Sequence, residues 1–261
     1  SSFQLWRNGE EVPLYTSVNT GNLPVGGFIE FWGEASDGKW EKRLYLKPKY
    51  QINELTSLFT DSAYYFLTVN TTGPNKRIIA SNNDLSSPLT PEPYFIHKSA
   101  FSFRNQYNVG FAAVVGEYVY SASYDEGEGY TSLNATPSSP VTSTLNNLFV
   151  SPSGPDAKVK FSVVGRALNT RNVRVRLNNT ILKDLEMNYF NSVIDSSLTS
   201  VPLSLISSST ATFQFQNLSP EPTDRMLVGM YELTYPRLFN FGGQSNFVFE
   251  MPASPNGNRL S

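Results

Sequence analysis

The chain contains no cysteine and a single histidine, and these two shortages exclude most protease and metal chemistry. Without cysteine there is no disulfide, no thiolate metal ligand and no thiol nucleophile. A serine triad or a His-rich metal site would depend on His97 alone, and no Gly-x-Ser-x-Gly motif accompanies it. His97 follows Tyr94-Phe95-Ile96 at the start of a predicted strand, where a partly buried histidine with a local hydrogen bond is the favoured interpretation. We therefore expect no catalytic residue in this chain.

Excess positive charge and long hydrophobic runs are also lacking. The 20 Lys and Arg residues against 22 Asp and Glu residues give a net charge of −2, which does not indicate a nucleic-acid partner. No apolar run approaches the roughly 20 residues that cross a bilayer, so we expect no membrane span. The first residues form no signal-peptide core. The protein is then either cytoplasmic or numbered from behind a removed signal.

Aromatic residues are abundant, at 13% of the chain with 18 Phe and 14 Tyr. Aromatic and β-branched side chains favour pleated sheets, and 17 Gly with 17 Pro can end strands at short intervals. A length of 261 residues is comfortable for two domains. We predict an all-β chain of two consecutive antiparallel β-sandwich (jelly-roll-like) domains with very little helix.

Strand and turn signals divide the first half of the chain. Asn8-Gly9 between two apolar segments is a strong hairpin signal, because both turn positions tolerate positive φ. Further strands are expected over 28–32, over 64–69 as a buried strand, and over 114–120. Only residues 50–60 could hold a short helix.

A domain boundary is expected within residues 136–155, where Pro, Ser and Gly resemble linker chemistry. The predicted domains are residues 1–145 and 146–261. In the second domain, apolar and polar residues alternate cleanly, which is typical of strands with one buried face. Asn178-Asn179 is the predicted tight turn of a hairpin in this part of the chain.

The most distinctive segment spans residues 123–130, where Asp125, Glu126 and Glu128 are separated by glycine. Three carboxylates on a flexible segment can supply oxygen ligands to calcium, the only cofactor for which the sequence offers candidate ligands. The spacing is not that of an EF-hand loop. The alternative, which we favour, is a turn whose carboxylates accept backbone or arginine hydrogen bonds.

Two other groups of residues invite a binding hypothesis. The first is a basic cluster around a predicted strand, for which the solvated face of a sheet is favoured over an acidic or polysaccharide partner; it comprises Arg166, Arg171, Arg174 and Arg176. The second is the set of tryptophans, which can stack on sugars but in an aromatic-rich β domain more often belong to the core; they are Trp6, Trp32 and Trp40.

Several blocks, in their order along the chain, resemble the N-terminal regions of gingipain-type cysteine peptidases, including the surface sortase of type IX secretion. The first block is Leu-Trp-Arg-Asn-Gly-Glu-Glu-Val-Pro at residues 5–13. The others lie at residues 27–33, 37–38, 57–61, 65–68, 125–130 and 235–241. The resemblance spans nearly the whole chain.

This resemblance implies a non-catalytic accessory or pro-region that precedes a peptidase domain, the domain that carries the catalytic His and Cys in such proteins. It further implies export by a Bacteroidetes-like bacterium to the periplasm or cell surface. The expected partners are the peptidase domain of the same polypeptide and, beyond it, secretion cargo or a glycan. Tyr235, Phe239 and Phe241 are the candidate interaction residues. The alternative function is a surface carbohydrate-binding module, with exposed aromatic side chains as stacking platforms.

Overall fold

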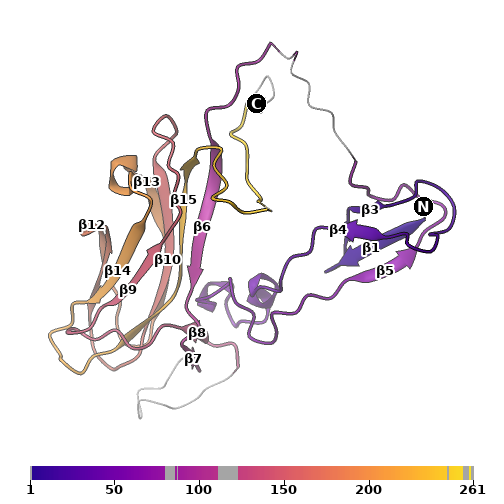
Figure 1. Cartoon of the computed structure of the whole chain (residues 1–261). Helices are drawn as coiled ribbons and strands as arrows, with labels where there is room; N and C mark the ends of the chain where they lie inside the picture. Colours follow the sequence, from indigo (N-terminus) through magenta and orange to yellow (C-terminus); the bar gives the residue numbers. More distant parts are fainter. Residues whose placement is uncertain are drawn as a thin grey trace. The chain divides into compact units, whose positions relative to one another are not determined.

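Strands are the main regular secondary structure of the computed structural model (Figure 1), which describes residues 2–79, 86, 88–110, 123–245, 247–254 and 259. Within those residues the helical elements are three short 3-10 turns, so the all-β prediction is confirmed. The strand expected over 114–120 lies outside the described residues. The elements are β1 (Phe3–Arg7), β2 (Glu10–Val12), β3 (Leu14–Thr16), β4 (Ile29–Phe31), η1 (Lys39–Arg43), η2 (Pro48–Tyr50), β5 (Phe66–Val69), β6 (Phe95–Ser102), β7 (Gln106–Asn108), β8 (Gly129–Thr131), β9 (Val141–Leu145), β10 (Ala157–Gly165), β11 (Asn172–Leu177), β12 (Thr180–Glu186), β13 (Ser192–Val201), η3 (Leu203–Ile206), β14 (Ala211–Asn217) and β15 (Met226–Arg237).

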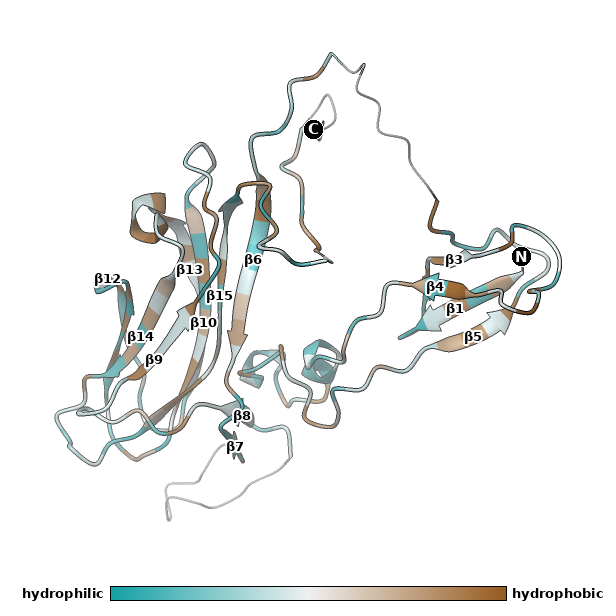
Figure 2. Cartoon of the chain, viewed as in Figure 1, coloured by the Kyte–Doolittle hydropathy of each residue, from teal (hydrophilic) through white to brown (hydrophobic). Residues whose placement is uncertain are grey.

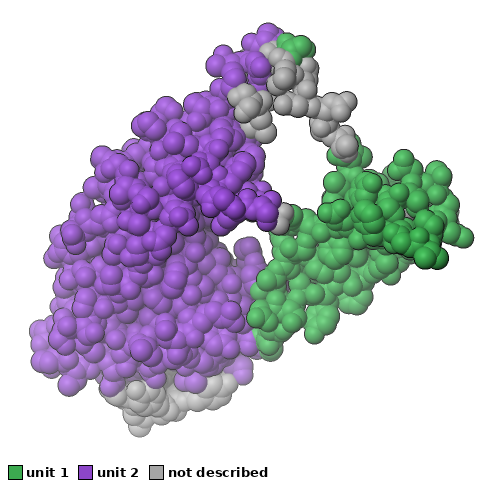
Figure 3. Space-filling model, viewed as in Figure 1, with its two compact units in different colours: residues 1–36, 59–87 green, residues 37–58, 88–261 purple. Residues whose placement is uncertain are grey.

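The chain forms two compact units (Figure 3), and neither is continuous in sequence. Unit 1 comprises residues 1–36 and 59–87, and unit 2 comprises residues 37–58 and 88–261. The units therefore do not divide at the expected boundary between residues 145 and 146. Strands β6 and β9 precede that boundary, yet β6 pairs with β15 and β9 pairs with β14. The Pro- and Ser-rich residues 136–155 contain strand β9 with turns and loops on either side of it, and all of them belong to unit 2.

Unit 2 is a sandwich of two four-stranded antiparallel sheets (Figure 1). One sheet has the strand order β13-β10-β15-β6, and the other has the order β12-β11-β14-β9. The two inner faces enclose a single core whose largest members are aromatic; they include Phe161, Phe213, Phe215 and Tyr231. Burial of this apolar surface is the main term that stabilises the unit.

The alternation of apolar and polar residues in the sequence decides which face of each of these strands is buried. In β14 every second side chain is buried, from Ala211 through Phe213 and Phe215 to Asn217. The turn at Asn178-Asn179 connects β11 to β12 as predicted, with φ values of 45° and 69° at its two residues. Positive φ at both central positions gives the turn a twist that matches the flanking strands.

Residues 50–58 cover the outer face of the sheet that contains β10 and β15, and the short helix that residues 50–60 could hold is not formed there. Ile52 packs against Val164 and Leu227, while the Asn53 amide donates to the carbonyl of Gly229 at 3.2 Å. A β-carbon at Gly229 would lie 2.4 Å from the Ile52 carbonyl oxygen, so only glycine permits this approach. Tertiary contacts with the sheet thus outweigh the local preference for helix.

Unit 1 contains the three-stranded sheet β2-β1-β5 and the pair β3-β4. The predicted Asn8-Gly9 hairpin is confirmed, with φ values of 52° and 80°. Among its described residues the buried apolar side chains are Leu5 and Leu14. Strand β5, which was expected to be buried, is exposed at all four positions (Figure 2 shows its hydrophobic colours).

Candidate functional site

His97 lies on β6 within an aromatic environment. Its ring packs edge-on against Tyr235, with centroids 5.7 Å apart, and lies 4.9 Å from the ring of Phe247. Burial, together with the positive charge of Arg237, lowers the pKa of His97 to about 4. A histidine that stays neutral down to this pH and is packed between rings has the geometry of a structural residue.

The acidic segment 123–130 forms a turn in which the three carboxylates turn to different partners. The Glu128 carboxylate accepts hydrogen bonds from the Tyr107 hydroxyl and from the backbone N–H of Tyr124. Asp125 accepts the N–H of Glu126 at 2.7 Å. Glu126 accepts the backbone N–H of Ser192 at 2.8 Å and its hydroxyl at 2.9 Å. Each carboxylate thus ties the turn to its own backbone or to a neighbouring strand.

A calcium site needs several oxygens that converge on one point. Among the residues that the structure describes, no group of three or more His, Cys, Asp or Glu side chains is placed to hold a metal ion. The three carboxylates of the acidic segment carry out the hydrogen bonding expected of a structural turn. The geometry therefore supports the turn, and the calcium hypothesis keeps only its sequence-based argument.

The four arginines of the predicted basic cluster do not act as one surface. Arg174 forms a paired hydrogen bond with Asp184 across the β11–β12 hairpin, at 2.8 and 2.7 Å. Arg176 donates to Gln216 at 2.9 Å, and Arg166 donates to Gln106 at 2.9 Å. The fourth member, Arg171, is fully buried.

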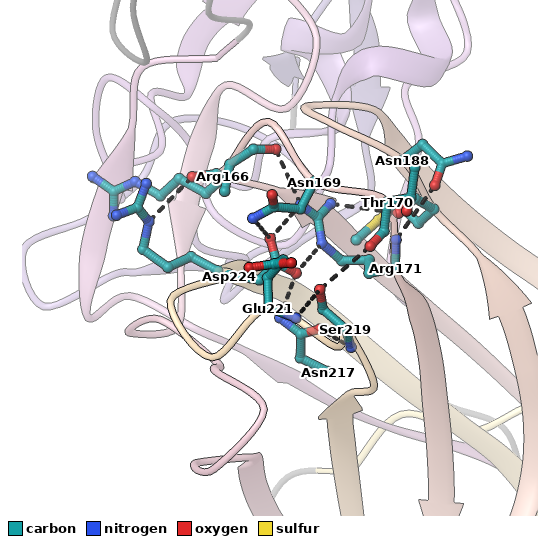
Figure 4. Close-up of polar contacts among 12 residues, drawn as sticks. Arg166, Asn169, Thr170, Arg171, Asn188, Asn217, Ser219, Glu221 and Asp224 are labelled. Carbon is teal, nitrogen blue, oxygen red and sulfur yellow. Dashed lines mark hydrogen bonds and ion pairs between the residues drawn. The ribbon is translucent and has the colours of Figure 1, made fainter.

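Arg171 and Asp224 form a buried ion pair at one end of the sandwich (Figure 4). The arginine Nε donates to one carboxylate oxygen at 2.6 Å and Nη2 donates to the other at 2.8 Å. The remaining N–H groups of Arg171 donate to the carbonyls of Tyr189, Ala167 and Met187. All five donors of the guanidinium are therefore satisfied, which is the condition under which a buried charge is tolerated.

Asp224 receives two further hydrogen bonds, from Asn169 at 3.1 Å and from Asn217 at 2.9 Å. Burial raises the pKa of Asp224, but the hydrogen bonds from Arg171 and Asn217 outweigh burial, and the net pKa lies below the usual value. This network joins the loop before β15 to the loop before β11. It therefore ties together the loops at this end of the sandwich.

The candidate interaction residues separate into a core residue and two surface residues. Tyr235 is only 1% exposed and belongs to the core of the sandwich. Phe239 and Phe241 are each 37% exposed and pack on buried Phe95, with ring centroids 5.2 and 6.0 Å away. The interaction hypothesis thus stays a prediction for Phe239 and Phe241, whereas the side chain of Tyr235 is buried and offers no surface to a partner.

Phe247 and Phe249 complete this group, which we call the Phe95 cluster: Phe95, Phe239, Phe241, Phe247 and Phe249. The ring centroid of Phe249 lies 4.6 Å from that of Phe95, and the backbone of Glu250 pairs with Ile96 at the edge of β6. The segment after β15 thus folds back onto β6 in unit 2.

Arg237, at the end of β15, holds this segment in place. Its guanidinium lies 4.9 Å from the ring centroid of Phe149 and 5.1 Å from that of Phe247. It also donates to the carbonyls of Asn147 and Asn240, at 2.8 and 2.9 Å. The exposed rings of the Phe95 cluster are consequently held in position by the contacts of Arg237 with residues of unit 2.

The tryptophans differ from the core residues that were expected. Trp32 is 46% exposed and Trp40 is 49% exposed, while Trp6 is half-buried. The guanidinium of Arg43 lies over the ring of Trp40, 5.2 Å from the ring centroid. Exposed aromatic side chains therefore occur in both units.

Sequence reasoning missed the Arg171–Asp224 pair and the position of Phe95 at the centre of an aromatic cluster. The two ion-pair partners are 53 residues apart, and no periodic pattern links positions at such a distance. The available signal was Arg171 itself, which directly precedes an alternating strand and could have been assigned to a strand end rather than to a solvated face.

No family model matches the sequence, and no curated protein matches it. Among solved structures, the fold is similar to the crystal structure of dimeric latent PorU from Porphyromonas gingivalis, with a TM-score of 0.53 and 10% sequence identity. That similarity covers 98% of this chain and 23% of the PorU chain, so this chain spans less than a quarter of PorU. At this identity the similarity establishes the fold.

A second solved structure is similar over part of the chain. It is the carbohydrate-binding module CBM36 in complex with calcium and xylotriose, with 9% sequence identity and a TM-score of 0.31 over 52% of this chain and 98% of that module. A TM-score this low carries no argument about fold or function. In the described part of the chain there is also no helix that is long and apolar enough to cross a membrane.

Proposed function

We propose that the chain is a non-catalytic accessory region of an exported gingipain-type peptidase-like protein, and that it packs against the peptidase domain of the same polypeptide. The observation that carries this proposal is the fold similarity to PorU, which extends over 98% of this chain but less than a quarter of that protein. It agrees with the sequence blocks that resemble gingipain-type N-terminal regions. We infer that both likenesses reflect one relationship.

The chemistry of the described residues supports a binding role. The sequence has no cysteine, and its single histidine is packed between the rings of Tyr235 and Phe247. Phe239 and Phe241 present partly exposed rings that pack on buried Phe95. A domain interface is enriched in such aromatic residues at its centre. Assistance of folding, restraint of the peptidase and docking of secretion cargo are all roles that this surface would serve.

The absence of catalysis can be tested on the purified chain. We predict that peptides with Arg, with Lys and with neither residue at the cleavage position are hydrolysed only at the background rate. The reason is the lack of any thiol nucleophile and of a histidine that can accept a proton near neutral pH. Turnover that persists through a second purification by a different method would contradict the prediction.

A further inference from the structure

The hairpin of β3 and β4 in unit 1 presents an exposed face that the proposed function does not use. Tyr15 lies directly opposite Glu30 in the register of this pair, and Leu14 lies opposite Phe31. Side chains alternate between the two faces of a strand, so Tyr15 and Glu30 share the face opposite to buried Leu14. Side chains opposite one another in such a pair are close, with Cβ atoms about 4.5–5.5 Å apart.

A hollow of about 350 Å³ lies on this hairpin. The segment that contains Ile78 forms one side of it, because the N–H of Ile78 donates to the carbonyl of Leu14 at 3.0 Å. Five of the six lining side chains are aromatic or aliphatic; the six are Tyr15, Glu30, Phe31, Trp32, Ile78 and Ile79. The volume is at the lower end of the range for small-ligand sites, and the walls are mainly apolar.

Glu30 is the single charged group in this lining. Among the described residues its carboxylate makes no hydrogen bond and no ion pair, whereas the carboxylate of Glu34 is paired with Arg7 at 3.3 Å. The rings of Tyr15 and Trp32 beside it are 42% and 46% exposed. The hollow therefore combines a carboxylate that has no cation with partly exposed aromatic side chains.

We propose that this hollow binds the side chain of a lysine or arginine on a partner polypeptide. Aromatic rings attract a cation through the negative charge of their faces, and a carboxylate adds direct charge complementarity. The methylene stem of such a side chain would lie along the apolar wall formed by Ile78 and Ile79. A neutral sugar would instead need several polar partners around its hydroxyl groups, and this lining offers chiefly Glu30 and the hydroxyl of Tyr15. The lining residues of this hollow all belong to unit 1 and are different from the residues of unit 2 that the proposed function uses.

The test uses the whole chain and two capped tripeptides, acetyl-Gly-Lys-Gly-amide and its norleucine counterpart, which has a similar stem without the charge. Binding is followed by NMR signals of the Trp32 indole, with Trp6 and Trp40 as internal references. We expect the lysine peptide to bind at least about fivefold more tightly than the norleucine peptide and to weaken as salt is added. Glu30→Gln should reduce its affinity about fivefold or more, and Glu10→Gln, which alters an exposed carboxylate on β2, should leave it unchanged.

A second variant, Trp32→Ala, should lose binding, as followed by the ring signals of Tyr15 in the same hollow, while its circular dichroism spectrum stays that of the parent chain. Equal affinity for the norleucine peptide, or unchanged affinity in Glu30→Gln, would overturn the proposal. A xylo-oligosaccharide titrated in parallel separates the other ligand class. If it shifts the Trp32 and Tyr15 signals while the lysine peptide shifts neither, the hollow is a glycan site and our assignment is wrong.

Discussion

Arg171 and Asp224 show how a single buried pair decides local stability. Because every donor of the guanidinium is used, removing the arginine leaves a buried carboxylate without its cation and three backbone carbonyls without a donor. We predict that Arg171→Leu lowers the free energy of unfolding of unit 2 by about 3–5 kcal/mol. The measurement is chemical denaturation followed by fluorescence.

The matched control for this substitution is Arg174→Leu, which removes the exposed pair with Asp184 and should change the unfolding midpoint little. Equal effects of the two substitutions would contradict the assignment. The lowered pKa of Asp224 adds a pH dependence. Its stabilising contribution is present above the pKa of an unfolded aspartate, about 3.9, and is lost as pH falls through the lower pKa of the folded state.

His97 gives a second pH dependence at the scale of one residue. Its pKa of about 4 in the folded state lies below the ordinary value of 6.5, so protonation favours the unfolded chain. The stabilisation is complete above pH 6.5 and declines as pH falls toward 4. We predict that an NMR titration of this single histidine gives a pKa near 4.

Between pH 6.5 and about 5 most carboxylates are still ionised, so a decline in stability there reports mainly on the histidine. His97→Phe keeps a ring in the aromatic environment and cannot take up a proton. The variant should lose the decline in stability over that window. A titration midpoint near 6.5 in the parent chain would show that the ring is solvated and would contradict its packed position.

At the scale of elements, the acidic turn is the segment where metal and hydrogen-bond interpretations compete. Because Glu128 accepts hydrogen bonds from Tyr107 and Tyr124, we predict that Glu128→Gln lowers the melting temperature equally in millimolar calcium and in chelator. A bound ion at a hundredfold excess over its Kd would raise the stability by about 2.7 kcal/mol. A calcium-dependent rise that Asp125→Ala with Glu128→Ala abolishes would instead establish a calcium site.

Local chemistry made some elements predictable from the sequence. Asn8-Gly9 and Asn178-Asn179 were found because a two-residue turn with positive φ selects such residues. Strand β14 was found because one buried face leaves a strict alternation. Prediction failed where long-range contacts decide the outcome. Residues 50–58 appear helix-compatible, yet Ile52 and its neighbours are held along a sheet by contacts with residues more than 100 positions away.

The same limit applies to the candidate site. The aromatic residues near the end of the chain were recognised by composition, but only the folded sheet shows that Tyr235 points into the core. Strand β5 is apolar in sequence and was therefore expected inside, whereas its side chains are exposed. An exposed apolar strand and a buried apolar strand have the same sequence pattern. The sequence alone does not show whether another element covers the strand.

At the scale of the whole molecule, the apolar surface of unit 1 is large for the small core beneath it. Its large exposed side chains include several that are more than half accessible: Phe59, Tyr64, Phe66, Val69 and Ile79. Large exposed apolar side chains of this kind supply the surface of interaction sites in soluble proteins. Together with the exposed rings of the Phe95 cluster, it fits a region that functions beside another folded domain.

The most direct test is association between this chain and the gingipain-type peptidase domain that we expect in the same reading frame. Interfaces between linked domains typically bury about 600–1,500 Å², and a linkage that provides millimolar effective concentration keeps them docked at a Kd below about 0.1 mM. We predict binding in this range by calorimetry between the two separately produced parts. The double variant Phe239→Glu with Phe241→Glu should abolish it, and Ile181→Glu, which alters an exposed apolar side chain on β12 outside both interaction surfaces, serves as the control and should leave binding unchanged. A reading frame without such a domain, or two folded parts that do not bind at 0.1 mM, would contradict the proposed function.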